Sequence, residues 1–131
     1  MFKHKPDSNE AYQLFLESSK HDYALIKLER SVEIKNRNYP VLVPGFREEK
    51  NKVTVCGYKE VKMEQYHQMS HANDLQFSED GGCYDIDTIK GQSGSPVYFM
   101  KKSDKEEIAH VVGIHKGFDR IVNINLCTLI T

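Results

Sequence analysis

The chain has 131 residues, a formal net charge of −1 at pH 7 and a hydrophobic content of 39%. This length predicts a single domain, and the near-neutral charge gives no sign of binding to nucleic acid or to a membrane surface. No apolar run approaches the ~20 residues of a membrane-spanning helix. The first residues, Met1 to Asp7, lack the apolar segment of a signal peptide.

The first patterned element covers residues 22–29, where Ala24, Ile26 and Leu28 alternate with neighbouring side chains before a charged stretch. This alternation predicts a strand that is buried for most of its length. Asp22 stands at its entry, where a carboxylate against an apolar wall can orient an imidazole. A bond from Asp22 to its own local turn is the plainer alternative.

The middle of the chain is more polar. Residues 31–52 surround two prolines that flank an apolar triplet, which predicts an extended connector. Residues 53–58 alternate and are rich in β-branched side chains, so they predict a strand that ends at Gly57. A long polar segment follows, residues 59–80, and Gly81 with Gly82 then predicts a turn.

A serine between two glycines is the most distinctive local feature. Residues 88–98 read Thr-Ile-Lys-Gly-Gln-Ser-Gly-Ser-Pro-Val-Tyr, with Ser93 at the centre. Glycines on both sides permit a sharp bend and close approach by a partner, and they leave the amides of Gly91 and Ser93 able to point the same way. A hydroxyl beside two convergent N–H donors is what acyl transfer requires. Small residues before a proline also form ordinary β-turns without chemistry.

The last third predicts a strand over residues 108–115, a turn over residues 118–120 and a further strand over residues 121–124. The cysteines are odd in number and irregularly spaced, and they do not predict a disulfide framework. One disulfide with a free thiol and three buried thiols both remain open for Cys56, Cys83 and Cys127.

Three short motifs, in order, resemble trypsin-like (chymotrypsin-fold) serine peptidases. Gly-Gln-Ser-Gly-Ser-Pro-Val around Ser93 resembles their nucleophile loop, and is most similar to that of the glutamyl-endopeptidase (V8-like) branch. Asp-Tyr-Ala-Leu-Ile-Lys-Leu from Asp22 resembles the stretch that carries the triad aspartate. Val-Val-Gly-Ile-His-Lys-Gly over residues 111–117 resembles the strand that lines the specificity pocket in that branch. The resemblance covers roughly residues 20–131, and motifs in the family's order are more specific than any one alone.

The resemblance implies an all-β fold, a trypsin-like double β-barrel with the N-terminal barrel truncated and the C-terminal barrel largely present. It assigns residues 1–46 to a remnant of the first barrel and the inter-barrel connector. Residues 47–131 then form the second barrel with the nucleophile loop, and residues 125–131 begin a short C-terminal helix.

The implied function is serine-type endopeptidase, with hydrolysis through an acyl-enzyme. Ser93 is then the nucleophile, Asp22 the acid that orients the base, and the amides of Gly91 and Ser93 the oxyanion hole. The resemblance implies no cofactor, a peptide or protein substrate, and secretion.

Substrate binding is implied for Thr88, His115 and Lys116. A histidine and a threonine hydroxyl can both donate to a carboxylate, which predicts cleavage after glutamate. If Asp87 points into the pocket, lysine or arginine is expected instead.

The triad histidine is missing from the sequence. In this family the order is His, Asp, Ser, and counting back ~45 residues from Asp22 runs off the chain. His4 has no buried strand end around it, and His21 adjoins Asp22 too closely to reach Ser93 as well. We therefore expect the C-terminal part of a peptidase, whose truncation is either biological or an artefact of the reading frame; the alternative is a catalytically inactive peptidase-like binding module.

A metal site is not expected. His67 and His71 are four residues apart, but no glutamate adjoins the first histidine as in a zinc peptidase, and no close cysteine pair is present. No nucleic-acid or membrane partner is expected, and the sequence leaves the oligomeric state open.

Overall fold

The computed structural model contains eight strands, and the prediction of an all-β fold is confirmed. The strands are β1 (Val41–Leu42), β2 (Thr54–Tyr58), β3 (His67–His71), β4 (Gln76–Ser78), β5 (Gly81–Tyr84), β6 (Pro96–Ser103), β7 (Glu106–Asp119) and β8 (Ile124–Leu129). The structure describes residues 10, 21–35, 38–48, 52–58, 67–71, 75–78, 81–86, 88, 91–121 and 123–131, with backbone only for 67–71 and 78.

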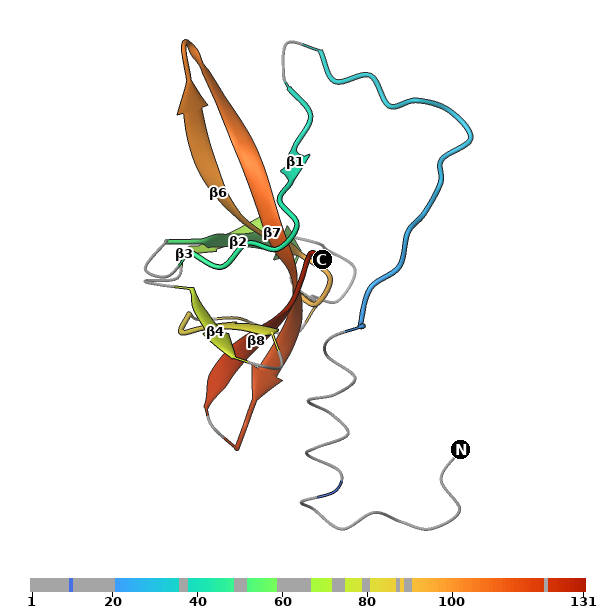
Figure 1. Cartoon of the computed structure of the whole chain (residues 1–131). Helices are drawn as coiled ribbons and strands as arrows, with labels where there is room; N and C mark the ends of the chain where they lie inside the picture. Colours follow the sequence, from blue (N-terminus) through green and yellow to red (C-terminus); the bar gives the residue numbers. More distant parts are fainter. Residues whose placement is uncertain are drawn as a thin grey trace.

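Seven strands follow one another in the order β3-β2-β6-β7-β8-β5-β4, and each neighbouring pair is antiparallel. β1 joins β7 as a short parallel partner. The sheet curls, so that β3 and β4, at the two ends of this path, lie on the same side of the body (Figure 1).

The strand β7 is the centre of the sheet. One edge of its first part pairs with β6, and the opposite edge pairs first with β1 and then, along its second part, with β8. The register shifts between His115 and Gly117, within the motif that resembles a pocket strand. Such irregularities bend a strand and change where its side chains point, so this shift lies where it can shape a site.

The core forms because valines and other apolar side chains alternate inward along β2, β6 and β7. Burying one such side chain contributes roughly 1.5–3 kcal/mol, and several here have almost no exposed surface. The buried cluster comprises Phe46, Val53, Val55, Leu75, Tyr84, Val97, Val112, Cys127 and Leu129.

The thiol of Cys127 lies in a space that two glycines leave open. A Cβ at Gly82 would lie 2.7 Å from Cys127 Sγ, and one at Gly113 would lie 3.1 Å from it. The predicted turn at Gly81 and Gly82 is therefore wrong: both residues belong to β5, where the absence of side chains lets β5 and β8 pack around the sulfur. All three cysteines are free thiols.

The prediction for residues 22–29 is also wrong. This stretch is extended but forms no strand, and the side chains of Leu25 and Ile26 are 93% and 83% exposed. Alternation gives a buried strand only when a neighbouring strand accepts its hydrogen bonds and covers its apolar face. No strand does so among the residues that the structure describes.

The predicted C-terminal helix is a strand. Residues 125–129 are all buried and lie in β8, which pairs on one side with β5 and on the other with β7. Both edges of this segment are therefore satisfied by strand partners, and a helix would leave those partners unpaired. The C-terminal helix that the family resemblance implied for residues 125–131 is therefore wrong.

The turn and strand predicted over residues 118–124 are displaced along the chain: β7 continues to Asp119, Ile121 and Asn123 lie in the turn, and β8 begins at Ile124. Two further predictions agree with the structure. Residues 53–58 give β2, and residues 108–115 lie within the longer β7. Residues 41–46 pack on the sheet, because Val43 N donates to Val111 O at 2.9 Å and Phe46 is in the core. The domain boundary at residues 46 and 47 stays a prediction. No helix in the described part of the chain is long and apolar enough to cross a membrane.

Candidate active site

The loop that carries Ser93 is a turn fixed to β7. Ser95 N donates to Gln92 O at 3.0 Å and closes the turn. Gly94 N donates to His115 O and His115 N donates to Ser95 O, each at 2.8 Å. These bonds on both sides of Ser93 hold the turn against one residue of β7. The serine is therefore presented at the surface on a short, well-anchored loop.

Glycine is required on each side of this turn. Gly91 has φ of 102° and Gly94 has φ of 90°, values that residues with a Cβ rarely adopt. The amides of Gly94 and Ser95 are used in the bonds above, whereas those of Gly91 and Ser93 donate to no other residue in the described ranges. Both predicted oxyanion donors are therefore available, and their convergence on one point stays a prediction.

A further glycine supports the loop from β2. A Cβ at Gly57 would lie 1.8 Å from Ser95 Oγ and 2.9 Å from Ser95 Cβ. The side chain of Ser95, which is buried, therefore occupies the space beside Gly57. Sequence reasoning used Gly57 only as the end of a strand and missed this contact.

Ser93 and Asp22 both contact Lys116. The exposed Ser93 donates from Oγ to the backbone O of Lys116 at 2.7 Å. Lys116 Nζ lies 3.8 Å from Asp22 Oδ2, with the lysine side chain 11% exposed and that of the aspartate 61% exposed. The two predicted triad residues thus meet at one residue of β7. Within the described ranges, no imidazole is hydrogen-bonded to either of them.

His115 is buried and tied to Tyr84. The phenol oxygen of Tyr84 lies 2.5 Å from Nδ1 of His115, and the imidazole is 2% exposed. Burial lowers the pKa of His115 to about 4, and burial raises the pKa of Tyr84 well above its ordinary value. At neutral pH the imidazole is therefore uncharged and the phenol keeps its proton. The sequence motif identified His115 but gave no signal for Tyr84, which lies 31 positions away.

Thr88 is held by a second buried polar residue. Its Oγ1 donates to Asn125 Oδ1 at 2.7 Å, and Asn125 Nδ2 donates to Ile86 O at 2.8 Å. Because the hydroxyl proton is already committed, Thr88 can donate to a substrate carboxylate only after rotating away from Asn125. Asp87, whose direction decided between the two predicted specificities, lies outside the described residues.

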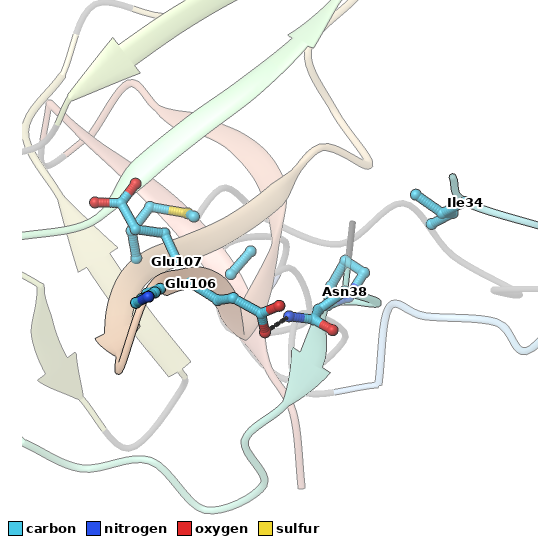
Figure 2. A pocket seen from close by; sticks show the side chains of 8 residues that line it. Ile34, Asn38, Glu106 and Glu107 are labelled. Atoms are coloured by element: carbon cyan, nitrogen blue, oxygen red, sulfur yellow. Dashed lines mark hydrogen bonds between the residues drawn. The ribbon is translucent and has the colours of Figure 1, made fainter. Parts of the chain in front are cut away.

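A groove lies at the other end of the β6–β7 hairpin, away from the Ser93 loop. It has a volume of about 610 Å³ and is bridged by a hydrogen bond from Asn38 to Glu106 (Figure 2). None of the predicted site residues lines it; the lining residues are Ile34, Asn38, Pro40, Met100, Lys105, Glu106, Glu107 and Ala109.

The side chains of His67 and His71 lie outside the described atoms, so the expectation that they hold no metal is untested. In the described part of the chain, no group of three or more metal-binding side chains comes together.

No family model and no curated protein matches the sequence. A solved structure of the murine norovirus NS6 protease, an inactive mutant with a cysteine replaced by alanine, is similar at 20% identity with a TM-score of 0.46. The alignment covers 70% of this chain and 57% of that one. The chain thus spans a little over half of the protease that it matches, and this likeness is too distant to transfer a catalytic type or a substrate.

Proposed function

We propose that this chain carries the nucleophile loop of a serine-type endopeptidase, with Ser93 attacking the peptide carbonyl to form an acyl-enzyme. The supporting observation is the turn itself. Ser93 is exposed between two glycines in left-handed conformations, its neighbours are fixed to His115, and the amides of Gly91 and Ser93 donate to no residue among those that the structure describes. Amides available beside a hydroxyl are suited to stabilising an oxyanion as it develops.

Activity of the 131-residue chain is expected to be slow. A serine hydroxyl needs a base to become a good nucleophile, and the Ser93 proton is donated to a carbonyl, which cannot accept it as a base. His115 does not fill this role, because its Nδ1 contacts Tyr84 and its pKa is lowered by burial. Oxyanion stabilisation and binding alone give ~10³-fold over water.

The substrate side chain is proposed to meet His115. A neutral imidazole supplies a hydrogen bond but no full charge, so it recognises an acceptor oxygen without demanding a carboxylate. The preference for glutamate expected from the sequence then depends on other groups, and glutamine becomes a competitor at the same position. A cleavage profile on a mixed peptide library, with His115→Ala alongside, separates glutamate, glutamine and the lysine or arginine expected from an inward Asp87.

A peptide-binding module without catalysis is the second candidate. It is favoured by one observation: Asp22 and Ser93 are both engaged by Lys116, rather than by an imidazole. In that case the Ser93 loop and the β7 strand would bind an extended peptide without forming a covalent bond.

The two candidates differ in whether a covalent adduct forms. The chain is incubated with an activated aryl ester, and intact mass is followed over hours. The serine peptidase proposal predicts one acyl group per chain, lost in Ser93→Ala and retained in Ser103→Ala, a control at the exposed hairpin tip. Equal acylation of the wild type and Ser93→Ala would contradict it, and peptide binding without any adduct would favour the module.

A further inference from the structure

Lys116 and His115 are neighbours on β7, but their side chains contact different elements. His115 contacts Tyr84 on β5, whereas Lys116 Nζ lies beside Asp22 on the segment before β1. Lys116 lies at the register shift between His115 and Gly117, where β7 departs from regular alternation, and the different partners show that the two side chains reach different elements. The ammonium of Lys116 therefore belongs to a different surface from the imidazole beside it.

This second surface adjoins the nucleophile. The backbone O of Lys116 accepts the hydrogen bond from Ser93 Oγ, so the lysine stands one contact away from the hydroxyl. Its side chain is largely covered, with 11% exposed, while its Nζ reaches Asp22. A stem packed in this way holds the ammonium in place instead of leaving it to move freely in solvent.

We infer that Lys116 forms a separate carboxylate-binding subsite beside Ser93, and that Asp22 of the same chain occupies it. The ligand class is the side-chain carboxylate of an aspartate or glutamate in an extended peptide. This inference rests on the proposed function insofar as peptides lie beside Ser93. It adds a second acidic determinant, at a different peptide position from the residue that meets His115.

The Asp22 contact is suited to displacement. Asp22 is 61% exposed and its oxygen lies 3.8 Å from Nζ, at the long end of ion-pair geometry. A long contact to an exposed carboxylate is weak, so a peptide carboxylate can replace Asp22 with little loss. Asp22 then acts as an internal competitor, which lowers the affinity for acidic peptides without closing the site.

The test uses the full chain and dye-labelled octapeptides of neutral sequence. In each peptide of the series, a single glutamate stands at a different position, and a matched peptide has glutamine at that position. Fluorescence anisotropy gives the dissociation constant of each peptide. Four proteins are compared: wild type, Lys116→Met, Asp22→Asn and Lys105→Met. The last removes a lysine at the exposed hairpin tip, away from Ser93, and controls for net charge.

At one peptide position, glutamate should bind about two- to five-fold more tightly than glutamine, the range of an exposed ion pair. Lys116→Met should remove this preference, Lys105→Met should keep it, and Asp22→Asn should increase it by a similar factor. Higher salt should weaken it.

A preference that survives Lys116→Met, or one that Asp22→Asn leaves unchanged, overturns the subsite. If Ser93 is acylated but no peptide position distinguishes glutamate from glutamine, the subsite fails and the proposed function stands. If acidic peptides follow the expected pattern but Ser93 is never acylated, the subsite stands and the proposed enzymatic activity fails.

Discussion

Tyr84 and His115 are joined by a buried hydrogen bond, with the phenol oxygen 2.5 Å from Nδ1 of the imidazole. The tyrosine lies on β5 and the histidine on β7, and both are almost wholly removed from solvent. The bond fixes the orientation of a ring that stands directly beside the Ser93 loop. Tyr84 contacts Nδ1, so the bond does not involve the other ring nitrogen, Nε2.

Removal of the Tyr84 hydroxyl should destabilise the fold, because it leaves Nδ1 of His115 without this hydrogen-bond partner in the core. Tyr84→Phe should lower the free energy of unfolding by about 1–3 kcal/mol, the range for a buried polar group that loses its partner. Urea denaturation measures this loss, and the ¹⁵N shifts of the imidazole should show a change in the tautomer balance. The same substitution at exposed Tyr23 is the control. Equal effects at both tyrosines would contradict the role of the buried bond.

Protonation of His115 should destabilise the fold. Burial lowers its pKa in the folded state to about 4, while the unfolded value is near 6.5. Between these values the unfolded chain binds a proton that the folded chain does not, so stability is fully present above pH 6.5 and falls as the pH drops towards 4. The difference in unfolding free energy between the wild type and His115→Gln should therefore become smaller or change sign over this range. His110→Gln is the matched control on β7, and an identical pH dependence for both variants would argue against a buried neutral His115.

Gly57 should tolerate no side chain while Ser95 is present. Gly57→Ala places a Cβ 1.8 Å from Ser95 Oγ, and overpacking of this kind costs typically 1–3 kcal/mol. Gly117→Ala is the control, because no atom lies within 4 Å of the Cβ that it would add. The double variant Gly57→Ala/Ser95→Gly should recover most of the loss, since it removes the clashing atoms. A double-mutant cycle without coupling would show that the two residues do not meet as described.

Part of this architecture follows from local sequence. The strands β2 and β7 were predictable because β-branched residues alternate there, and the Ser93 turn was predictable from its flanking glycines. The strands β3 and β4 were not, because most of their residues are polar and they lack the alternating β-branched side chains of β2 and β7. For residues 22–29 the sequence wrongly predicted a buried strand. Their apolar side chains alternate clearly, but no described strand covers them.

The site shows the same division between local and distant information. The motif around Ser93 and the one around His115 each identify a residue, and the structure joins them through backbone bonds of Gly94 and Ser95. Tyr84 could not be found in this way, because its contact with His115 depends on how β5 and β7 pack. The meeting of Asp22 with Lys116 likewise depends on tertiary placement and has no local signal.

Cys127 should react with an alkylating reagent more slowly than Cys56 or Cys83. It is buried, and burial raises its pKa to about 12, which leaves almost no thiolate at neutral pH. With a small alkylating reagent at pH 7.5, Cys56 and Cys83 should be modified first, and Cys127 only after unfolding. Peptide mapping by mass spectrometry reads the order, and full modification in denaturant is the control. Early labelling of Cys127 would contradict its placement between β5 and β7.

The exposed apolar side chains of residues 23–28 should cause association. Leu25 and Ile26 project almost fully into solvent, and unpartnered apolar surface of this kind favours self-association. Analytical ultracentrifugation should show oligomers that decrease in Leu25→Glu/Ile26→Lys, with no loss of unfolding free energy. The control is Lys27→Glu/Glu29→Lys, which exchanges two charged residues of the same segment and leaves its apolar side chains in place. A monodisperse wild-type monomer with a cooperative melt would refute this prediction.

The central claim is that Ser93 is a nucleophile held beside oxyanion donors, and the most direct measurement is the site of reaction with a fluorophosphonate, mapped by mass spectrometry after proteolysis. The phosphonyl group should be found on Ser93, at a slow rate. Gly91→Ala should slow the reaction further, because Gly91 has φ of 102° and a Cβ there strains the loop and displaces its amides. Modification of other hydroxyls at the same rate as Ser93, or an unchanged rate in Gly91→Ala, would contradict the account.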